Sequence, residues 1–159
     1  MLKMYRITND RQEYWETWDA GDGSHTVHWG ILGTNGESKS VKPTLFGKAL
    51  NLVQKEIDAK IEEGFSPIDE DAHAVLLIEY SVDEMGDEND LSKRHQLEER
   101  MNEFLGWTGL GACDGGSIGS GTMEVCCFVV DFQCGKLAIE TNLADTKFAN
   151  FTRIYNENA

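Results

Sequence analysis

Proline is scarce in this chain of 159 residues, which contains only 2. That scarcity argues against a proline-rich linker or a polyproline array. Basic residues are also few, because 14 Lys and Arg stand against 28 Asp and Glu, for a formal charge of −14 and a pI of about 4.5. A protein this acidic repels phosphate backbones and anionic lipids unless its basic residues cluster. The balance therefore disfavours nucleic acids and membrane surfaces as ligands of the whole chain.

Long hydrophobic runs are missing as well. The longest are Ala74–Ile78 and Val125–Val130, which fall far short of the roughly 20 residues that a membrane-spanning helix needs. Residues Met1–Asp10 lack the apolar stretch of a signal peptide. The four cysteines form no CxxC pair and are too few for a secreted disulfide scaffold. We therefore expect a cytoplasmic protein with reduced thiols and no membrane association.

The charge is distributed unevenly along the chain. The net charge is −2 up to residue 68 and −12 beyond it. The change coincides with Pro67 and the acidic run that follows it, and a helix is expected to end just before this proline. Hydrophobic residues make up 40% of the chain, so each half can bury a core. We predict two domains, 1–66 and 73–159, joined by a short linker at about 66–72.

The first half is predicted to form an antiparallel sheet followed by one helix. The expected strands are Lys3–Thr8, Tyr14–Trp18, His25–Leu32 and Glu37–Lys42. Asn35-Gly36 favours a type I′ hairpin turn between the last two. The helix is expected from about 44 to 63, with Thr44 as its N-cap. Its sheet-facing stripe is predicted to be Phe46, Ala49, Leu50, Val53, Ile57 and Ile61.

The first half also carries motifs in a distinctive order. It reads Val27-His28-Trp29-Gly30-Ile31-Leu32-Gly33, then Asn35-Gly36, Phe46-x-x-Ala49, Lys60 and Gly64-Phe65. Over about residues 1–68 this order resembles the WGR domain family, which is named for a Trp-Gly-Arg triplet and is best studied in poly(ADP-ribose) polymerases. The resemblance implies contact with DNA ends and with neighbouring domains. Trp29 and Gly30 match the triplet, whereas Ile31 stands in the position of the arginine, the residue best suited to pair with phosphate.

The second half is predicted to alternate strands and helices in the order βαββαβ. The expected elements are strand Ala74–Val82, helix Leu91–Leu105, strands Thr108–Cys113 and Thr122–Phe132, helix Gln133–Leu143 and strand Phe148–Tyr155. This order predicts a ferredoxin-like sandwich with its first and third strands in the middle, and an α+β fold for the chain. The second helix is expected to bury Leu137, Ala138 and Leu143. Because two strands are continuously apolar, the sheet face without helices should be covered by the first domain or by a second copy of the chain.

Two segments of the second half have compositions typical of ligand-binding loops. The glycine-rich segment 109–121 lacks the lysine and the following helix of a phosphate-binding loop. It is interpreted as a long hairpin turn, or alternatively as a recognition loop that presents Asp114 and Ser117 to a protein. The acidic segment Asp83–Asp90 does not match the ligand spacing of an EF-hand. Asp90 is expected to cap the helix that follows.

No catalytic or metal-binding set is apparent. His25 and His28 should point to opposite faces of one strand, and so should the adjacent Cys126 and Cys127. There is no HExxH motif, and no base is placed beside a cysteine. We therefore expect neither an enzyme nor a bound metal or cofactor. A small-molecule enzyme built on the glycine-rich segment is the least favoured interpretation.

These features favour a non-enzymatic interaction protein. The acidic second half would bind a partner with a basic surface, as in an immunity or regulatory protein that blocks a nuclease. Trp15 or Trp18 could provide an aromatic anchor for that partner, whereas Trp29 is expected in the core. The alternative, from the WGR resemblance, is DNA-end binding through the first half, which charge reversal at Lys39 and Lys42 would weaken. The basic residues available for it are Lys3, Arg6, Arg11, Lys39, Lys42, Lys48, Lys55 and Lys60.

Overall fold

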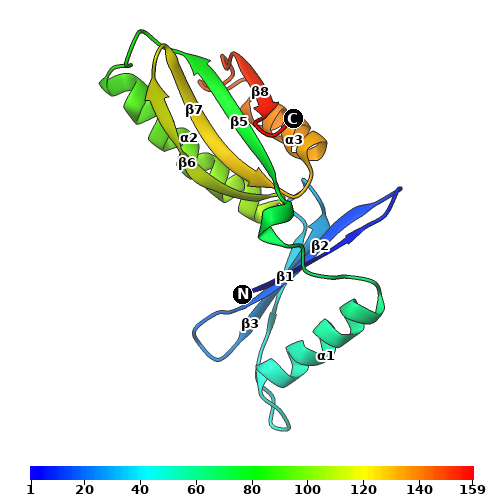
Figure 1. The fold of residues 1–159 in the computed structure, drawn as a ribbon. Coiled ribbons are helices and arrows are strands. Elements are labelled where there is room, and N and C mark those ends of the chain that lie inside the picture. Colours follow the sequence, from blue (N-terminus) through cyan, green and yellow to red (C-terminus); the bar gives the residue numbers. More distant parts are fainter. The chain divides into compact units, whose positions relative to one another are not determined.

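A computed structural model describes all residues from 1 to 159 and divides the chain into two compact units, Met1–Asp69 and Glu70–Ala159 (Figure 1). The fold is α+β, with two antiparallel four-stranded sheets and three helices. The boundary between the units falls inside the segment where a linker is predicted. A single 3₁₀ turn, Glu70–Ala72, opens the second unit. None of the helices is long and apolar enough to cross a bilayer.

The first unit contains a meander of four strands and one helix. The strands are β1 (Leu2–Ile7), β2 (Gln12–Asp19), β3 (His25–Ile31) and β4 (Glu37–Val41), and they pair in sequence order. The four predicted strands are therefore confirmed. Helix α1 (Ala49–Glu62) packs against β3 and β4. The core between sheet and helix consists of Met4, Trp15, Val27, Val53 and Phe65.

Helix α1 begins five residues later than predicted. Thr44 does not cap it, because the Thr44 amide donates to the Gly47 carbonyl at 2.8 Å and closes a separate tight turn. That turn leaves Phe46 99% exposed. Leu50 and Ile61 are also exposed, so the predicted sheet-facing stripe is wrong at these three positions. The buried stripe is narrower and runs through Ala49 and Val53.

The connection between β3 and β4 is not a two-residue type I′ turn. Gly36 has a left-handed φ of 61°, but Asn35 does not, and such a turn requires both. A side chain at Gly36 would overlap the carbonyl oxygen of Trp29 and the hydroxyl of Tyr14. The segment follows a longer path over the sheet, where the Tyr14 hydroxyl donates to the Thr34 carbonyl at 2.9 Å. Tertiary contacts rather than the local dipeptide set this conformation.

The second unit has the predicted βαββαβ order. Its elements are β5 (Ala74–Ser81), α2 (Glu88–Trp107), β6 (Gly111–Gly119), β7 (Thr122–Val129), α3 (Phe132–Leu143) and β8 (Arg153–Asn156). The sheet order is β6-β7-β5-β8, so the first and third strands of the unit are central, as predicted. Helix α2 contacts β6 and β7, and α3 contacts β5 and β8. Both helices lie on one face of the sheet (Figure 1).

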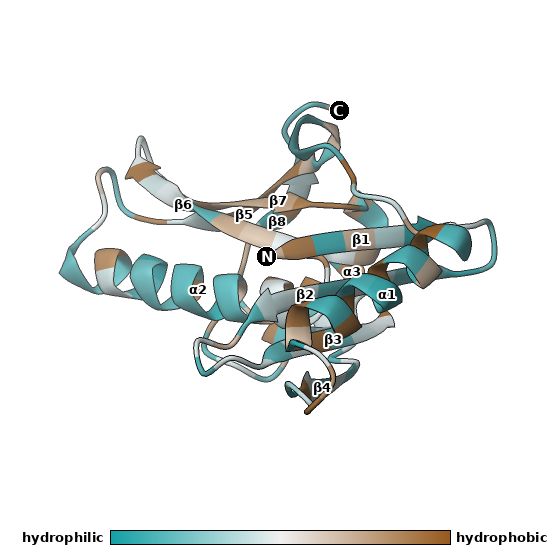
Figure 2. Ribbon diagram, turned by 90° about the horizontal axis from the view of Figure 1, so that it is seen from below, coloured by the Kyte–Doolittle hydropathy of each residue, from teal (hydrophilic) through white to brown (hydrophobic).

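The core of the second unit lies between this sheet face and the two helices. The helix-facing side chains of β5 and β7 are almost fully buried; they are Leu76, Ile78, Tyr80, Met123, Val125, Cys127 and Val129. Strand β7 alternates, and Phe128 on its other face is 37% exposed. The prediction that β7 is buried on both faces is therefore wrong. Figure 2 shows α2 largely hydrophilic along its ribbon, because few of its residues face the core.

The ends and faces of the two helices differ in detail from the predictions. Asp87, not Asp90, is the N-cap of α2, and it accepts hydrogen bonds from the amides of Asn89 and Asp90. The Asp90 side chain accepts from the Asp87 amide in return, which completes a capping box. In α3, Leu137 is 67% exposed. Gly135 packs closely against the Val129 side chain of β7. The side of the helix that faces the sheet therefore carries Gly135, Ile139 and Leu143, which are buried.

The glycine-rich segment is a strand rather than a long turn. Strand β6 takes up most of it and pairs with β7, with a register shift at Asp114 that forms a bulge. The hairpin turn is only Ser120-Gly121, whose φ values of 54° and 84° are those of a type I′ turn. The glycines have a low intrinsic preference for a strand, and backbone pairing with β7 stabilises the strand conformation. Phe148, predicted in the last strand, instead lies before β8, where its carbonyl accepts from the Tyr80 hydroxyl at 2.7 Å.

Candidate functional site

A cavity of about 500 Å³ opens in the first unit, at one end of its sheet. Strands β1 to β3, the segment after β3 and the last turn of α1 all contribute to its wall. Three cationic side chains, Arg6, Arg11 and Lys60, line it together with two carboxylates, so the lining carries one net positive charge. In a chain of charge −14 the lining is thus less acidic than the protein as a whole, although Lys60 also pairs with Glu63 outside it. The cavity is therefore a candidate for binding an anion.

Strand register gathers these residues. Arg6 in β1 lies opposite Glu13 in β2, and Glu13 lies opposite Ile31 in β3, so the three form one row across the sheet. Arg11 precedes Glu13 by two residues and comes to the same face. Helix α1 covers part of this face, and its last turn adds Lys60 at the edge of the row. Strands β1 and β2, the turn between them and helix α1 thus place charged groups around one point, next to Ile31 of β3.

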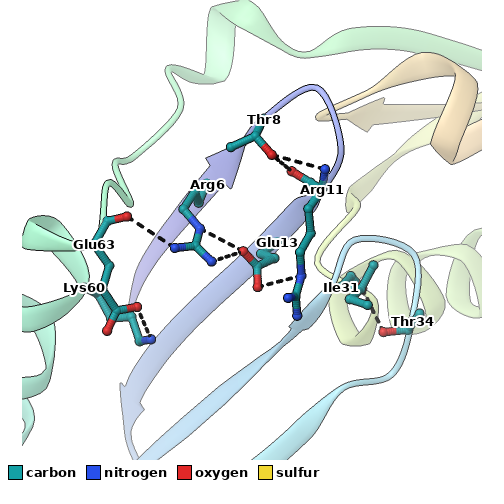
Figure 3. A network of polar contacts seen from close by, with 8 residues as sticks. All are labelled: Arg6, Thr8, Arg11, Glu13, Ile31, Thr34, Lys60 and Glu63. Carbon is teal, nitrogen blue, oxygen red and sulfur yellow. Dashed lines mark hydrogen bonds and ion pairs between the residues drawn. The ribbon is translucent and has the colours of Figure 1, made fainter.

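Glu13 is the centre of the charged network (Figure 3). Its Oε2 accepts from Arg6 Nε at 2.8 Å and Nη2 at 2.5 Å, and its Oε1 lies 3.0 Å from Arg11 Nε. The Glu13 side chain is 13% exposed, whereas Arg6 is 34% and Arg11 59% exposed, so water screens the Arg11 contact more than the Arg6 contact. The contact between Glu13 and Arg11 runs through Arg11 Nε, and the Arg11 side chain is largely exposed. Glu13 therefore holds the Arg11 guanidinium while leaving its fork of donors open to a ligand.

Aromatic faces support two of the cations. The Arg6 guanidinium lies 5.0 Å and the Lys60 ammonium 5.2 Å from the ring centre of Phe65, within cation–π range. Lys60 also donates to Glu63 Oε2 at 2.6 Å. The half-buried Trp29 forms another part of the cavity wall. These contacts restrict the cations to the wall before any ligand arrives.

Ile31, which replaces the arginine of the WGR triplet, lies at this cavity and is 49% exposed. Figure 3 shows it beside Arg11. The side chain at position 31 thus contributes apolar surface, and the guanidinium beside it is that of Arg11, from the turn just before β2. The sequence showed that Ile31 replaces the arginine of the triplet. It did not show that Arg11 lies beside Ile31, because that proximity depends on strand register.

The opposite face of the same sheet holds a buried polar cluster. His28 Nδ1 lies 2.7 Å from Glu16 Oε1, and His28 Nε2 lies 2.7 Å from the Asn35 carbonyl oxygen and 3.2 Å from the Tyr14 hydroxyl. Burial, and secondarily the Glu16 charge, raises the pKa of Tyr14. His28 is 1% exposed and is engaged at both ring nitrogens. The cluster therefore ties the segment after β3 to the sheet and leaves no ring nitrogen for a substrate.

The predicted binding residues of the first half are dispersed. Trp15 is 2% exposed and belongs to the core, so the expectation that it could be an exposed anchor is wrong. Trp18 is half-buried and meets His28 edge-on. Lys39 pairs with Glu56 at 2.8 Å and lies over Trp29, and Lys42 is exposed beyond β4. Neither lysine lines the cavity.

The second unit presents an acidic tip, defined as residues 83–88 together with the Ser120-Gly121 turn. The Val82 amide donates to the Gly121 carbonyl at 3.0 Å, and the Gly121 amide donates to the Glu84 carbonyl at 2.6 Å, so loop and turn are joined. Four carboxylates are exposed around Met85, which is itself 71% exposed. They are Asp83, Glu84, Asp87 and Glu88. Hydrogen bonds, chiefly from the Asp90 amide, lower the pKa of Asp87.

The predicted pair on β6 lies outside the acidic tip. Asp114 is exposed at the bulge, and Ser117 is exposed opposite Glu124. No group of three His, Cys, Asp or Glu side chains in the protein is arranged to hold a metal ion.

No family model, curated protein or solved structure matches this chain.

Proposed function

We propose that this chain is a non-enzymatic, cytoplasmic interaction protein whose acidic second unit binds a partner protein with a basic surface. The observation that supports this is the acidic tip, where four exposed carboxylates surround the exposed Met85. An apolar centre with a charged rim is a favourable arrangement for a protein interface. The tip is held by backbone hydrogen bonds and the capping box of α2, so little order must be gained on binding.

The charge of the second unit supports the choice of a basic partner. Opposite potentials accelerate encounter, and they suppress association with acidic competitors. The partner would present lysine or arginine side chains around a small apolar recess that accepts Met85. An immunity-like protein that covers the basic surface of a nuclease would meet this description, as would a regulatory subunit.

Charge reversal at the tip tests this proposal. The variant Asp83→Lys/Glu84→Lys is compared with Glu99→Lys/Glu103→Lys, which makes the same charge change on exposed positions of α2. Tagged wild-type protein should retain a basic partner that the tip variant loses and the α2 variant keeps. Equal loss with both variants would mean that only the overall charge matters. Retention by all three would remove the tip from the interface.

A second function is favoured by the cavity of the first unit. Arg6, Arg11 and Lys60 converge there, and Arg11 has open donors that match a phosphate. This supports nucleic-acid binding at a DNA end, as the WGR resemblance implies. Arg11 would then pair with the phosphate in place of the arginine that Ile31 replaces. The binding would be strongly salt-dependent, because phosphate contacts release counterions.

Labelled blunt-ended duplexes with and without a 5′-phosphate test the second function at low and physiological salt. A charge-assisted hydrogen bond is worth about 1.5–3 kcal/mol, so Arg11→Gln should weaken binding by roughly 10- to 150-fold. Lys42, one of the two lysines that the sequence alone favours for this function, is exposed outside the cavity. If the cavity is the binding site, Lys42→Gln should have little effect and serves as the control. Absence of binding at low salt would eliminate this function without affecting the first.

A further inference from the structure

Two cysteines face each other across strands β6 and β7. Cys113 lies directly opposite Cys127 in the register of the pair, and both are free thiols. Cys127 lies opposite Leu76 in β5, on the face that the helices cover, and is completely buried. Cys113 shares that face but is only partly buried. The neighbouring Cys126 points to the other face, opposite Leu77.

The hydrogen-bond ladder shows what kind of pair this is. The Val130 amide donates to the Leu110 carbonyl at 2.9 Å, which makes 110 and 130 a hydrogen-bonded pair. Such pairs alternate with non-hydrogen-bonded pairs along an antiparallel ladder. Counting from this pair, Ala112 and Phe128 form a backbone hydrogen-bonded pair. Cys113 and Cys127 therefore form a pair without backbone hydrogen bonds between them. The Cα atoms of a non-hydrogen-bonded pair are about 4.5 Å apart, within the range of about 4.4–6.8 Å that a disulfide spans.

The pKa values of the two thiols shift in opposite directions. A hydrogen bond between the Cys127 and Cys113 side chains lowers the pKa of Cys113, and the same bond together with burial raises the pKa of Cys127. Cys113 thus has more thiolate character and is also the more accessible of the two. A lowered pKa and partial exposure are the properties that make a thiol react first with an oxidant.

We propose that Cys113 and Cys127 form an oxidative modification site that closes to an intramolecular disulfide when the protein meets a peroxide. The Cys113 thiolate attacks one oxygen of hydrogen peroxide and becomes a sulfenic acid, and water is released. The Cys127 sulfur then displaces the hydroxyl group from the Cys113 sulfur, forming the S–S bond and a second water. In total two thiols lose two electrons and two protons, and one peroxide is reduced to two waters.

The location gives this bond a structural consequence. Asp114, the residue after Cys113, is the extra residue of the β6 bulge, and Cys113 Sγ lies 3.9 Å from the Gly115 carbonyl oxygen. A bond to Cys127 would fix the strand at the start of the bulge. Oxidation would thus restrict the edge strand next to Asp114, its one acidic residue, whereas the reduced pair leaves the strand free to adjust.

The test uses the full chain after reduction and removal of the reductant. Hydrogen peroxide is added, and intact mass together with peptide mapping reports the products. Cleavage at Asp114 and Glu124 separates Cys113 from Cys126 and Cys127, and cleavage at Asp131 separates Cys134. The expected product is a monomer that has lost two hydrogens, with the Cys113 peptide linked to the peptide of Cys127. A thiol reductant should restore the original mass.

Variants distinguish the possible partners. Cys126→Ser and Cys134→Ser should form the linked monomer as efficiently as wild type. Cys113→Ser and Cys127→Ala should not form it, and thermal melting of both variants establishes that they are folded. Loss of the bond in Cys126→Ser with retention in Cys127→Ala would overturn the assignment. Formation of only intermolecular disulfides, or of sulfinic acid at Cys113 without a link, would overturn it as well.

Discussion

Glu13→Gln is the sharpest test of the charged network in the first unit. The Glu13 carboxylate accepts from two nitrogens of Arg6 and lies 3.0 Å from Arg11 Nε, and the side chain is 13% exposed. Glutamine keeps the shape but replaces one oxygen with an amide donor that faces a guanidinium donor. At least one charge-assisted contact is lost, and each is worth about 1.5–3 kcal/mol. We therefore expect the first unit to lose about 1.5–3 kcal/mol of unfolding free energy.

Tryptophan fluorescence during urea or thermal unfolding measures this loss. Three of the four tryptophans, Trp15, Trp18 and Trp29, lie in the first unit, so the signal reports mainly on it. For a unit of this size, each kcal/mol corresponds to roughly 4–8 °C in Tm. The control is Glu56→Gln, which removes a more exposed pair with Lys39. Its cost should be about 0–1 kcal/mol.

Equal effects of the two substitutions would refute the reasoning. Such a result would mean that the buried position of Glu13 adds nothing to its ion pairs. An increase in stability for Glu13→Gln would go further, because it would show that the desolvation of the carboxylate exceeds its attraction to both arginines.

Three further predictions concern backbone strain, helix capping and assembly. Gly36→Ala should cost at least about 1–3 kcal/mol, because the residue has a left-handed φ and an added Cβ would overlap the Trp29 carbonyl oxygen. Gly47→Ala, with open space around the added Cβ, should be nearly neutral in the same melts. Asp87→Ala should lower the stability of the second unit in urea unfolding. Since the folded-state pKa of Asp87 lies below its unfolded value, this difference should be present above the unfolded pKa and disappear as the pH falls through the folded one. If a second copy packs on the open sheet face, light scattering should give a dimer for wild type and a monomer for Phe128→Lys, whereas a wild-type monomer at all concentrations would exclude this dimer.

Secondary structure was largely predictable, because its signals are local. Alternation and turn residues located all four strands of the first unit, and the βαββαβ order of the second was correct. Errors occurred where a contact with another element overrode local propensity. The glycines of β6 resemble a loop in sequence, but hydrogen bonding to β7 makes them a strand. Similarly, the apolar stripe of α3 rotated away from Leu137 because Gly135 packs against Val129.

The cavity was much less predictable. Its cations were all among the eight basic residues available in the first half, but no sequence pattern favoured Arg6, Arg11 and Lys60 over Lys39 and Lys42. Arg6 and Lys60 are separated by more than fifty positions. They meet because antiparallel pairing places Arg6 beside Glu13 and because α1 ends next to the same row.

The sequence by itself determined what depends on composition and on neighbours along the chain: the acidic balance, its concentration in the second half, the alternation of strands and helices, and the absence of a recognisable catalytic motif. Only the tertiary structure decided which charges meet, which tryptophan is buried and which cysteines face each other. The physical reason is that strand register and helix packing are set by the burial of whole faces. A shift of one residue would send Arg6, Glu13 and Cys113 to the opposite sides of their sheets.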